Sequence, residues 1–263
     1  MSQETRSTGE ALDDVLEFWN HRAGLGQWAG TNDITAKRLE METLAKFVRE
    51  GMRIIDVGCG NGITAMEIAR RFDVEITGLD FSPEMIAAAK SLAAPQTFRG
   101  KVTFAVAKVP GLTDTAAGCD LVYTERTLIN LPTWSEQEQA IREIGELVRP
   151  GGCFLMCENS QDGLDELNAL RQRIGLPRIQ PPWHNRYLRD REIESGSFGS
   201  LALEHIEYYS STYYLFSRIV NAWLAQREGV DPAYDSPINE LALQLPSIGK
   251  LGQGRLWIWR RGA

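Results

Sequence analysis

The alternation of apolar and polar positions predicts strands separated by amphipathic helices through the first 160 residues. The apolar stretch 52–57, which contains several β-branched side chains, has the length of a buried strand, and apolar residues at helical spacing follow from Ile63 to Ala69. Further strand-like stretches lie at residues 74–80, 102–107, 120–124 and 153–158. Strands that alternate with helices are typical of an open α/β sheet, whose ligands bind at the carboxyl ends of the strands.

Three alternating glycines, Gly58, Gly60 and Gly62, lie between the first strand and its helix. Glycine lets the backbone approach a ligand closely and adopt dihedral angles that a Cβ forbids. The spacing differs from the G-x-G-x-x-G pattern of dinucleotide sites, and no Walker-type lysine follows, which disfavours a triphosphate. Asp56 lies two residues before Gly58 and would repel a phosphate but attract a cation. We therefore predict a nucleotide-like ligand that carries a positive charge.

This stretch resembles motif I of the class I S-adenosylmethionine-dependent methyltransferases, a strand followed by D-x-G-x-G-x-G. Three further landmarks follow in the order of that family: a second strand that ends in Asp80, a fourth strand at 118–123, and the turn 150–152 before a fifth. The resemblance implies a seven-stranded, mostly parallel Rossmann-like sheet with helices on both faces and an antiparallel last strand. It also implies S-adenosylmethionine as cofactor and S-adenosylhomocysteine as product. An NAD-dependent oxidoreductase is the main competitor for the same glycines.

The resemblance also implies the residues of a cofactor site. Asp80, about twenty residues after the glycines, would bind the ribose hydroxyls. Family members often carry an aromatic-Trp-x-x-Arg segment that folds over the cofactor, as 18–22 would here, although its tryptophan could equally serve to anchor the N-terminal helix. The predicted cofactor-binding residues are Trp19, Arg22, Asp56, Gly58, Cys59, Gly60, Gly62, Asp80, Phe81, Met85, Lys108, Val109, Glu125 and Asn130.

One position departs from the family pattern. Many relatives have an aspartate at the end of the third strand that accepts a hydrogen bond from the adenine amino group, whereas this chain has Lys108, which has no acceptor atom. The backbone N–H of Val109 can still bind the adenine ring. The alternative is a shifted register in which Asp114 is the acceptor.

Beyond the fifth strand the chain is longer than a minimal methyltransferase fold. A proline-bounded stretch at 177–187 carries tryptophan, histidine, asparagine, arginine and tyrosine, and two helices near 211–228 and 237–245 separate the last two strands. We predict an N-terminal lid at 1–32, a cofactor-binding core at 33–160, helical cap segments for the acceptor at 161–200 and 211–252, and final core strands at 201–210 and 253–263.

Methyl transfer from a sulfonium requires positioning and the exclusion of water more than a dedicated catalytic triad. A hydroxyl acceptor would gain from a general base. His184 is the first candidate because the unperturbed pKa of histidine suits that task, and Glu158 and Tyr187 are weaker candidates.

A carboxylate acceptor would need no base but would bind an arginine such as Arg22, Arg126 or Arg186. The predicted substrate-binding residues are Trp28, Arg126, Trp183 and Arg186. The expected acceptor is a small molecule with a hydroxyl or carboxylate oxygen, such as a sugar-nucleotide or a secondary metabolite. Methylation of tRNA or protein, and a protein that binds the cofactor without turnover, are the alternatives.

Composition narrows these possibilities. The net charge of −7 disfavours a large nucleic-acid interface, and the three histidines and four dispersed cysteines give a metal site little to build on, so no metal is predicted. No apolar stretch is long enough to span a bilayer, and the polar start lacks the apolar region of a signal peptide. We therefore expect a cytoplasmic monomer or homodimer without a membrane partner.

Overall fold

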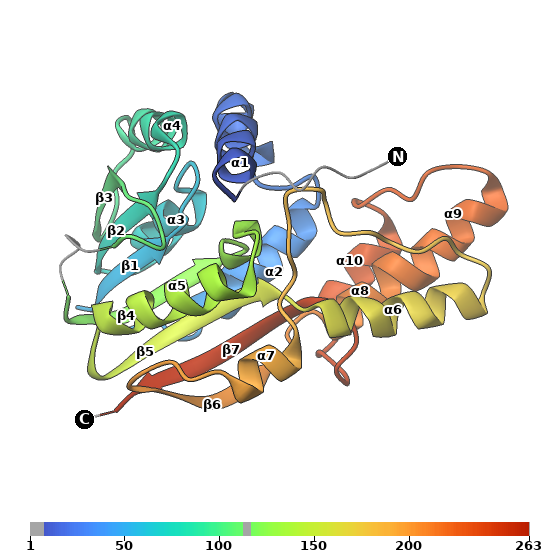
Figure 1. The fold of residues 1–263 in the computed structure, drawn as a ribbon. Helices are drawn as coiled ribbons and strands as arrows, with labels where there is room; N and C mark the ends of the chain where they lie inside the picture. The colour runs from blue at the N-terminus through green and yellow to red at the C-terminus, as the bar shows by residue number, and fades with distance from the viewer. Residues whose placement is uncertain (1–7, 113–116, 263) are drawn as a thin grey trace.

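The computed structural model describes residues 8–112 and 117–262, whose seven strands form one sheet of order β3-β2-β1-β4-β5-β7-β6 (Figure 1). The strands are β1 (Arg53–Val57), β2 (Glu75–Asp80), β3 (Lys101–Val106), β4 (Cys119–Glu125), β5 (Val148–Asn159), β6 (Leu201–Glu207) and β7 (Gly254–Arg261). Neighbouring strands pair in parallel except that β7 is antiparallel to both β5 and β6. The predicted sheet with its antiparallel last strand is confirmed.

Helices cover both faces of this sheet. On one face, α5 (Trp134–Leu147) and α7 (Asp190–Ser195) bury apolar side chains against the inner strands. On the other face, α2 (Ile34–Ala45), α3 (Ile63–Arg71) and α4 (Pro83–Ala93) do the same. Because the central strands are buried from both sides, they read as nearly continuous apolar runs in the sequence.

The N-terminal segment packs beside the sheet rather than on it. Helix α1 (Thr8–Arg22) and the short 3₁₀ helix η1 (Ala23–Trp28) lie against α4, where Ala23 and Trp19 contact Met85 in one apolar cluster (Figure 1). This brings α1 to the edge formed by the carboxyl ends of β1 and β2.

Five helical segments lie together beyond the carboxyl ends of β4 and β5, and we call them the helical cap (Figure 1). They are α6 (Gln161–Arg173), α8 (Ser211–Tyr214), the π-helix η3 (Leu215–Asn221), α9 (Ala222–Glu228) and α10 (Pro237–Leu243). The predicted helix near 211–228 is thus observed as three segments with a π-helical middle. Helix α7 is not part of this group, because Ile193 packs in the sheet core. Among the described residues, no helix has the length and apolar character needed to cross a membrane.

We expect Gly62→Ala to destabilise the fold by about 1 to 3 kcal/mol more than the control Gly175→Ala, which is the usual cost of overpacking. Gly62 begins α3 with φ of 77°, and a Cβ there would lie 2.5 Å from the Phe104 ring. Gly175 has φ of 76° but open space around it, so both variants share the backbone strain and only one has the clash. Urea unfolding of the two variants measures the difference, and equal losses would contradict this packing.

Candidate active site

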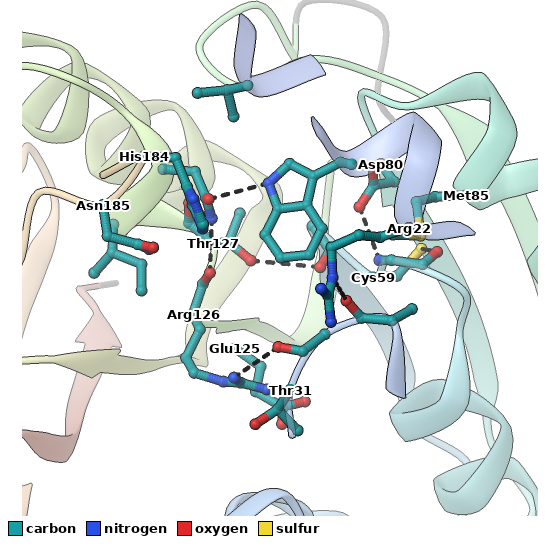
Figure 2. A pocket seen from close by; sticks show the side chains of 18 of the residues that line it. Arg22, Thr31, Cys59, Asp80, Met85, Glu125, Arg126, Thr127, His184 and Asn185 are labelled. Atoms are coloured by element: carbon teal, nitrogen blue, oxygen red, sulfur yellow. Dashed lines mark hydrogen bonds between the residues drawn. The ribbon is translucent and has the colours of Figure 1, made fainter. Parts of the chain in front are cut away.

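A cavity of about 580 Å³ opens at the carboxyl ends of β1, β2 and β4. Its walls come from the glycine loop, α1, the loop 181–187 and the helical cap, so segments far apart in the sequence enclose one space. Figure 2 shows Asp80, Met85 and Cys59 on one side of this cavity and His184, Asn185 and Arg126 on the other. Its size is that of a small-molecule site.

The glycine loop forms the first wall. Gly60 has φ of 54°, and a Cβ there would meet no atom within 4 Å, so the loop backbone is open to the cavity. Gly58 packs tightly instead, since a Cβ would lie 2.2 Å from Oγ1 of Thr127. Gly62 does not line the cavity, which corrects its prediction as a cofactor contact: its left-handed conformation begins α3. The other predicted cofactor-binding residues all line the cavity.

Asp80 is held in place by two backbone donors. The N–H of Gly60 donates to Oδ2 at 2.8 Å and the N–H of Ser82 donates to Oδ1 at 2.9 Å. Burial raises the pKa of this carboxyl, and these hydrogen bonds oppose the rise. A carboxylate oxygen accepts more than one hydrogen bond. Asp80 therefore retains acceptor capacity toward the cavity, as binding of a ribose diol requires.

Asp56 also lines the cavity, but its carboxyl is engaged. The hydroxyl of Tyr123 donates to Oδ2 at 2.8 Å, and burial raises the pKa of Asp56 to about 8. Burial thus favours the protonated form of this carboxyl in the ligand-free protein. A bound cation would favour its ionised form.

A buried charge network lies beneath the cavity at the end of β4. Glu125 accepts hydrogen bonds from Nζ of Lys37 at 2.7 Å and from the hydroxyl of Thr64 at 2.6 Å. Next to it, Nε of Arg126 lies 3.2 Å from Oε2 of Glu40. Burial raises the pKa of Glu40, and Glu125 adds to the rise. For Glu125, burial acts to raise the pKa, but Lys37, Glu40 and Arg126 together lower it.

An aromatic cluster joins α1 to the loop 181–187 above the cavity. The rings of Phe18 and His184 lie 4.3 Å apart, and Trp19 and Trp183 approach His184 edge-on at 5.6 and 5.2 Å. Nε1 of Trp19 also donates to Oδ1 of Asn130 at 3.1 Å. Trp19 therefore has both roles considered from the sequence, since it lines the cavity and also packs α1 against α4.

The three predicted catalytic residues have different positions. His184 and Tyr187 line the cavity. Burial, with a smaller effect of Arg22, lowers the pKa of His184 to about 4, and its Nδ1 has no hydrogen-bond partner in the part of the chain described. Glu158 does not line the cavity, which corrects its prediction as a base. Its carboxylate accepts the N–H groups of residues 127–129 and so holds the loop after β4.

Two of the four predicted substrate-binding residues lie outside the cavity lining. Arg126 and Trp183 line the cavity. Arg186 instead pairs with Glu192 and Gln137. Trp28 is 47% exposed and lies outside the cavity lining.

Several lining residues were not predicted, among them Phe18, Asn61, Asp33, Asn159, Asn185 and Arg218. Asn185 could have been found in the polar cluster around His184. Arg218 could not have been found from the sequence. Its Nη2 donates to Oδ2 of Asp33 at 2.6 Å, and the two residues are 185 positions apart in the sequence. Asp114, the alternative adenine acceptor, lies outside the described residues.

Comparison with known proteins agrees with this geometry. Residues 54–152 match the family described as a methyltransferase domain. Residues 54–152 thus form a methyltransferase domain. This confirms the predicted family, whose cofactor is S-adenosylmethionine, and disfavours the oxidoreductase alternative.

Two curated proteins resemble this methyltransferase domain. O-methyltransferase rstn1 of Aspergillus nomiae is 32% identical over 53% of the chain and 62% of its own length. The 27-O-demethylrifamycin SV methyltransferase of Amycolatopsis mediterranei is 28% identical over 54% of the chain and 53% of its own length. The chain thus spans little more than half the length of these relatives. Among solved structures, the cyclase SpnF shares the fold over 97% of the chain and 95% of its own, with a TM-score of 0.60 and 21% identity.

We expect Asp80→Asn to weaken binding of S-adenosylhomocysteine by about ten- to a hundredfold, the value of a charge-assisted hydrogen bond. The amide keeps the size of the side chain but loses one acceptor oxygen and the charge. Asp73→Asn makes the same change at an exposed position and should bind normally. Calorimetric titration measures both, and equal affinities would contradict the ribose assignment.

The histidine environment gives a second prediction. The ring proton signals of His184, followed by NMR, should titrate with a pKa of about 4 because the ring is buried among aromatic side chains. Arg22→Gln should raise that pKa by removing a nearby positive charge. A wild-type value near 6.5 would show that the aromatic cluster is open in solution.

Proposed function

We propose that the protein transfers the methyl group of S-adenosylmethionine to an oxygen atom of a small molecule. The observation that carries this proposal is the single cavity, which joins the glycine loop and Asp80 to side chains of the lid and the helical cap. One half suits an adenosyl cofactor and the other half leaves room for an acceptor. The names of the two curated O-methyltransferases support oxygen as the atom methylated.

The residues present fit this cofactor. The open backbone at Gly60 and the acceptor oxygens of Asp80 suit a ribose beside a glycine loop, and Lys108 and Val109 line the end of the cavity where adenine is expected. When bound, S-adenosylmethionine supplies a methyl group that is already activated for displacement. The task of the chain is then to align the acceptor and to exclude water, and the aromatic cluster of Phe18, Trp183 and His184 covers the cavity as that task requires.

The arginines of residues 171–191 do not favour a nucleic-acid acceptor. Arg178, Arg186 and Arg189 each pair with a carboxylate, and Arg171 donates to the backbone carbonyls of Pro177 and Arg218. A phosphate backbone would have to displace these partners. We therefore propose a small-molecule acceptor, such as a sugar-nucleotide or secondary metabolite, and a cytoplasmic location for a monomer or homodimer.

Two measurements on the purified protein test the proposal. Calorimetry should show binding of S-adenosylmethionine and S-adenosylhomocysteine but not of NAD. Incubation with methyl-deuterated S-adenosylmethionine and a metabolite extract should then produce a deuterated methyl ether or ester, detected by mass spectrometry. Absence of adenosyl binding would refute the cofactor site. Binding with a labelled amine or thiol product, or with no labelled product in extracts of the source cells, would refute oxygen methylation.

A further inference from the structure

Arg126 occupies an unusual position at the acceptor end of the cavity. It directly follows β4 and has φ of 55°, the one positive value for a non-glycine residue in the described chain. Such backbone strain costs on the order of 1 kcal/mol and persists only where the surroundings enforce it. Here Nη1 donates to the carbonyl of Gly30 at 3.0 Å, which fixes the guanidinium group in the cavity wall. Figure 2 shows Arg126 directed toward Thr31.

The guanidinium group of Arg126 is only partly satisfied by its neighbours. Its carboxyl neighbour is Glu40, whose pKa is raised by burial and by the adjacent carboxylate of Glu125, while Arg126 opposes the rise. Glu125 itself is paired with Lys37. Nε of Arg126 and Oε2 of Glu40 are both buried without a hydrogen bond, although they lie 3.2 Å apart. The pair therefore does not satisfy the guanidinium group.

Arg218, which reaches the cavity from the helical cap, has a fully paired charge. Arg218 forms an ion pair with Asp33 at 2.6 Å and stacks over Tyr234 at 4.8 Å, so its charge is compensated. Arg126 therefore presents a guanidinium group, with one N–H not hydrogen-bonded, in the wall of the acceptor half of the cavity. A buried guanidinium group in such a setting favours an anion.

In the part of the chain that the structure describes, His184 and Glu158 are poorly placed to take a proton from an alcohol in this half of the cavity. His184 is surrounded by the rings of Phe18, Trp19 and Trp183, and no carboxylate accepts a hydrogen bond from it. Glu158 is turned away to hold the loop after β4. An aliphatic alcohol would need a base with a pKa much closer to its own. An oxygen that is already ionised needs none.

Resting on the proposed function, we propose that the acceptor binds as an oxyanion, a carboxylate or an ionised phenol or enol, with Arg126 as its counter-ion. A lone pair of that oxygen forms the new bond to the methyl carbon while the bond from sulfur to that carbon breaks and its electrons stay on sulfur. The anion and the sulfonium are both neutralised, and no proton has to be removed. The neighbouring Tyr187, Asn159 and Asn185 supply polar contacts, and Ile129 and Trp183 supply apolar ones.

The test compares benzoate with benzyl alcohol, which have similar shape and different charge, on protein saturated with S-adenosylhomocysteine. Benzoate should bind about tenfold tighter or more, the value of one charge-assisted hydrogen bond. Arg126→Gln should abolish this preference and leave the affinity for S-adenosylhomocysteine unchanged. The control Arg227→Gln, at an exposed arginine stacked on Trp223, should keep the preference.

Three results would overturn the proposal: equal binding of the two probes, no binding of benzoate, or a preference that survives Arg126→Gln. Loss of affinity for S-adenosylhomocysteine in Arg126→Gln would also overturn it, because Arg126 would then serve the cofactor. If wild-type protein fails to bind S-adenosylhomocysteine at the first step, the proposed function itself is wrong. The two failures are therefore distinguishable.

A second variant, Glu40→Gln, tests the proposal even if Arg126→Gln does not fold. Ionisation of Glu40, whose pKa is raised by burial, strengthens its interaction with Arg126, so benzoate binding should weaken as pH rises. Glu40→Gln should remove that decline, and a decline that persists in this variant would contradict the proposal. The other groups that face Glu40 are Lys37, Arg126, Glu125, Cys157, Tyr187, Tyr209 and Tyr214. Burial raises the pKa of the thiol and of the three phenols, so these groups stay neutral as Glu40 ionises.

Discussion

The buried carboxylate of Glu125 determines how the floor of the cavity is assembled. A buried charge is costly unless it is paired and hydrogen-bonded, and here the partners come from two different helices, Lys37 of α2 and Thr64 of α3. These contacts hold both helices against the end of β4. Since α3 carries the glycine loop and β4 ends at Arg126, the same network places the cofactor wall and the acceptor wall at a fixed separation.

Helix α2 also connects this floor to the helical cap. Asp33 begins α2 by accepting the N–H of Ala36, and the same carboxylate accepts hydrogen bonds from Tyr213 and Arg218 of the cap. On the opposite side of the cavity, the ring of Phe18 in α1 packs against His184. Apart from Arg126 and its neighbours after β4, the acceptor half of the cavity is thus built by segments outside the matched domain of residues 54–152. We infer that these added segments determine which acceptor binds beside the cofactor site of the matched domain.

The parts that could be predicted from sequence are those with local causes. A strand followed by alternating glycines predicts β1 and its turn, and the spacing to Asp80 predicts a side chain at the same sheet edge, both of which the structure confirms. The errors arise where distant segments decide the outcome. Whether Arg186 or Asn185 faces the cavity depends on the path of an irregular loop. The pKa of His184 depends on burial against α1, which its own neighbours in sequence do not reveal.

We infer that one cavity holds the cofactor at the glycine loop and presents Arg126 to an acceptor. A crystal structure of the protein with S-adenosylhomocysteine tests this most directly. We expect the ribose hydroxyls to bind the carboxylate of Asp80 and the sulfur to face the half of the cavity that contains Arg126 and His184. A ribose bound elsewhere, or a cofactor carboxylate seated on Arg126, would contradict it.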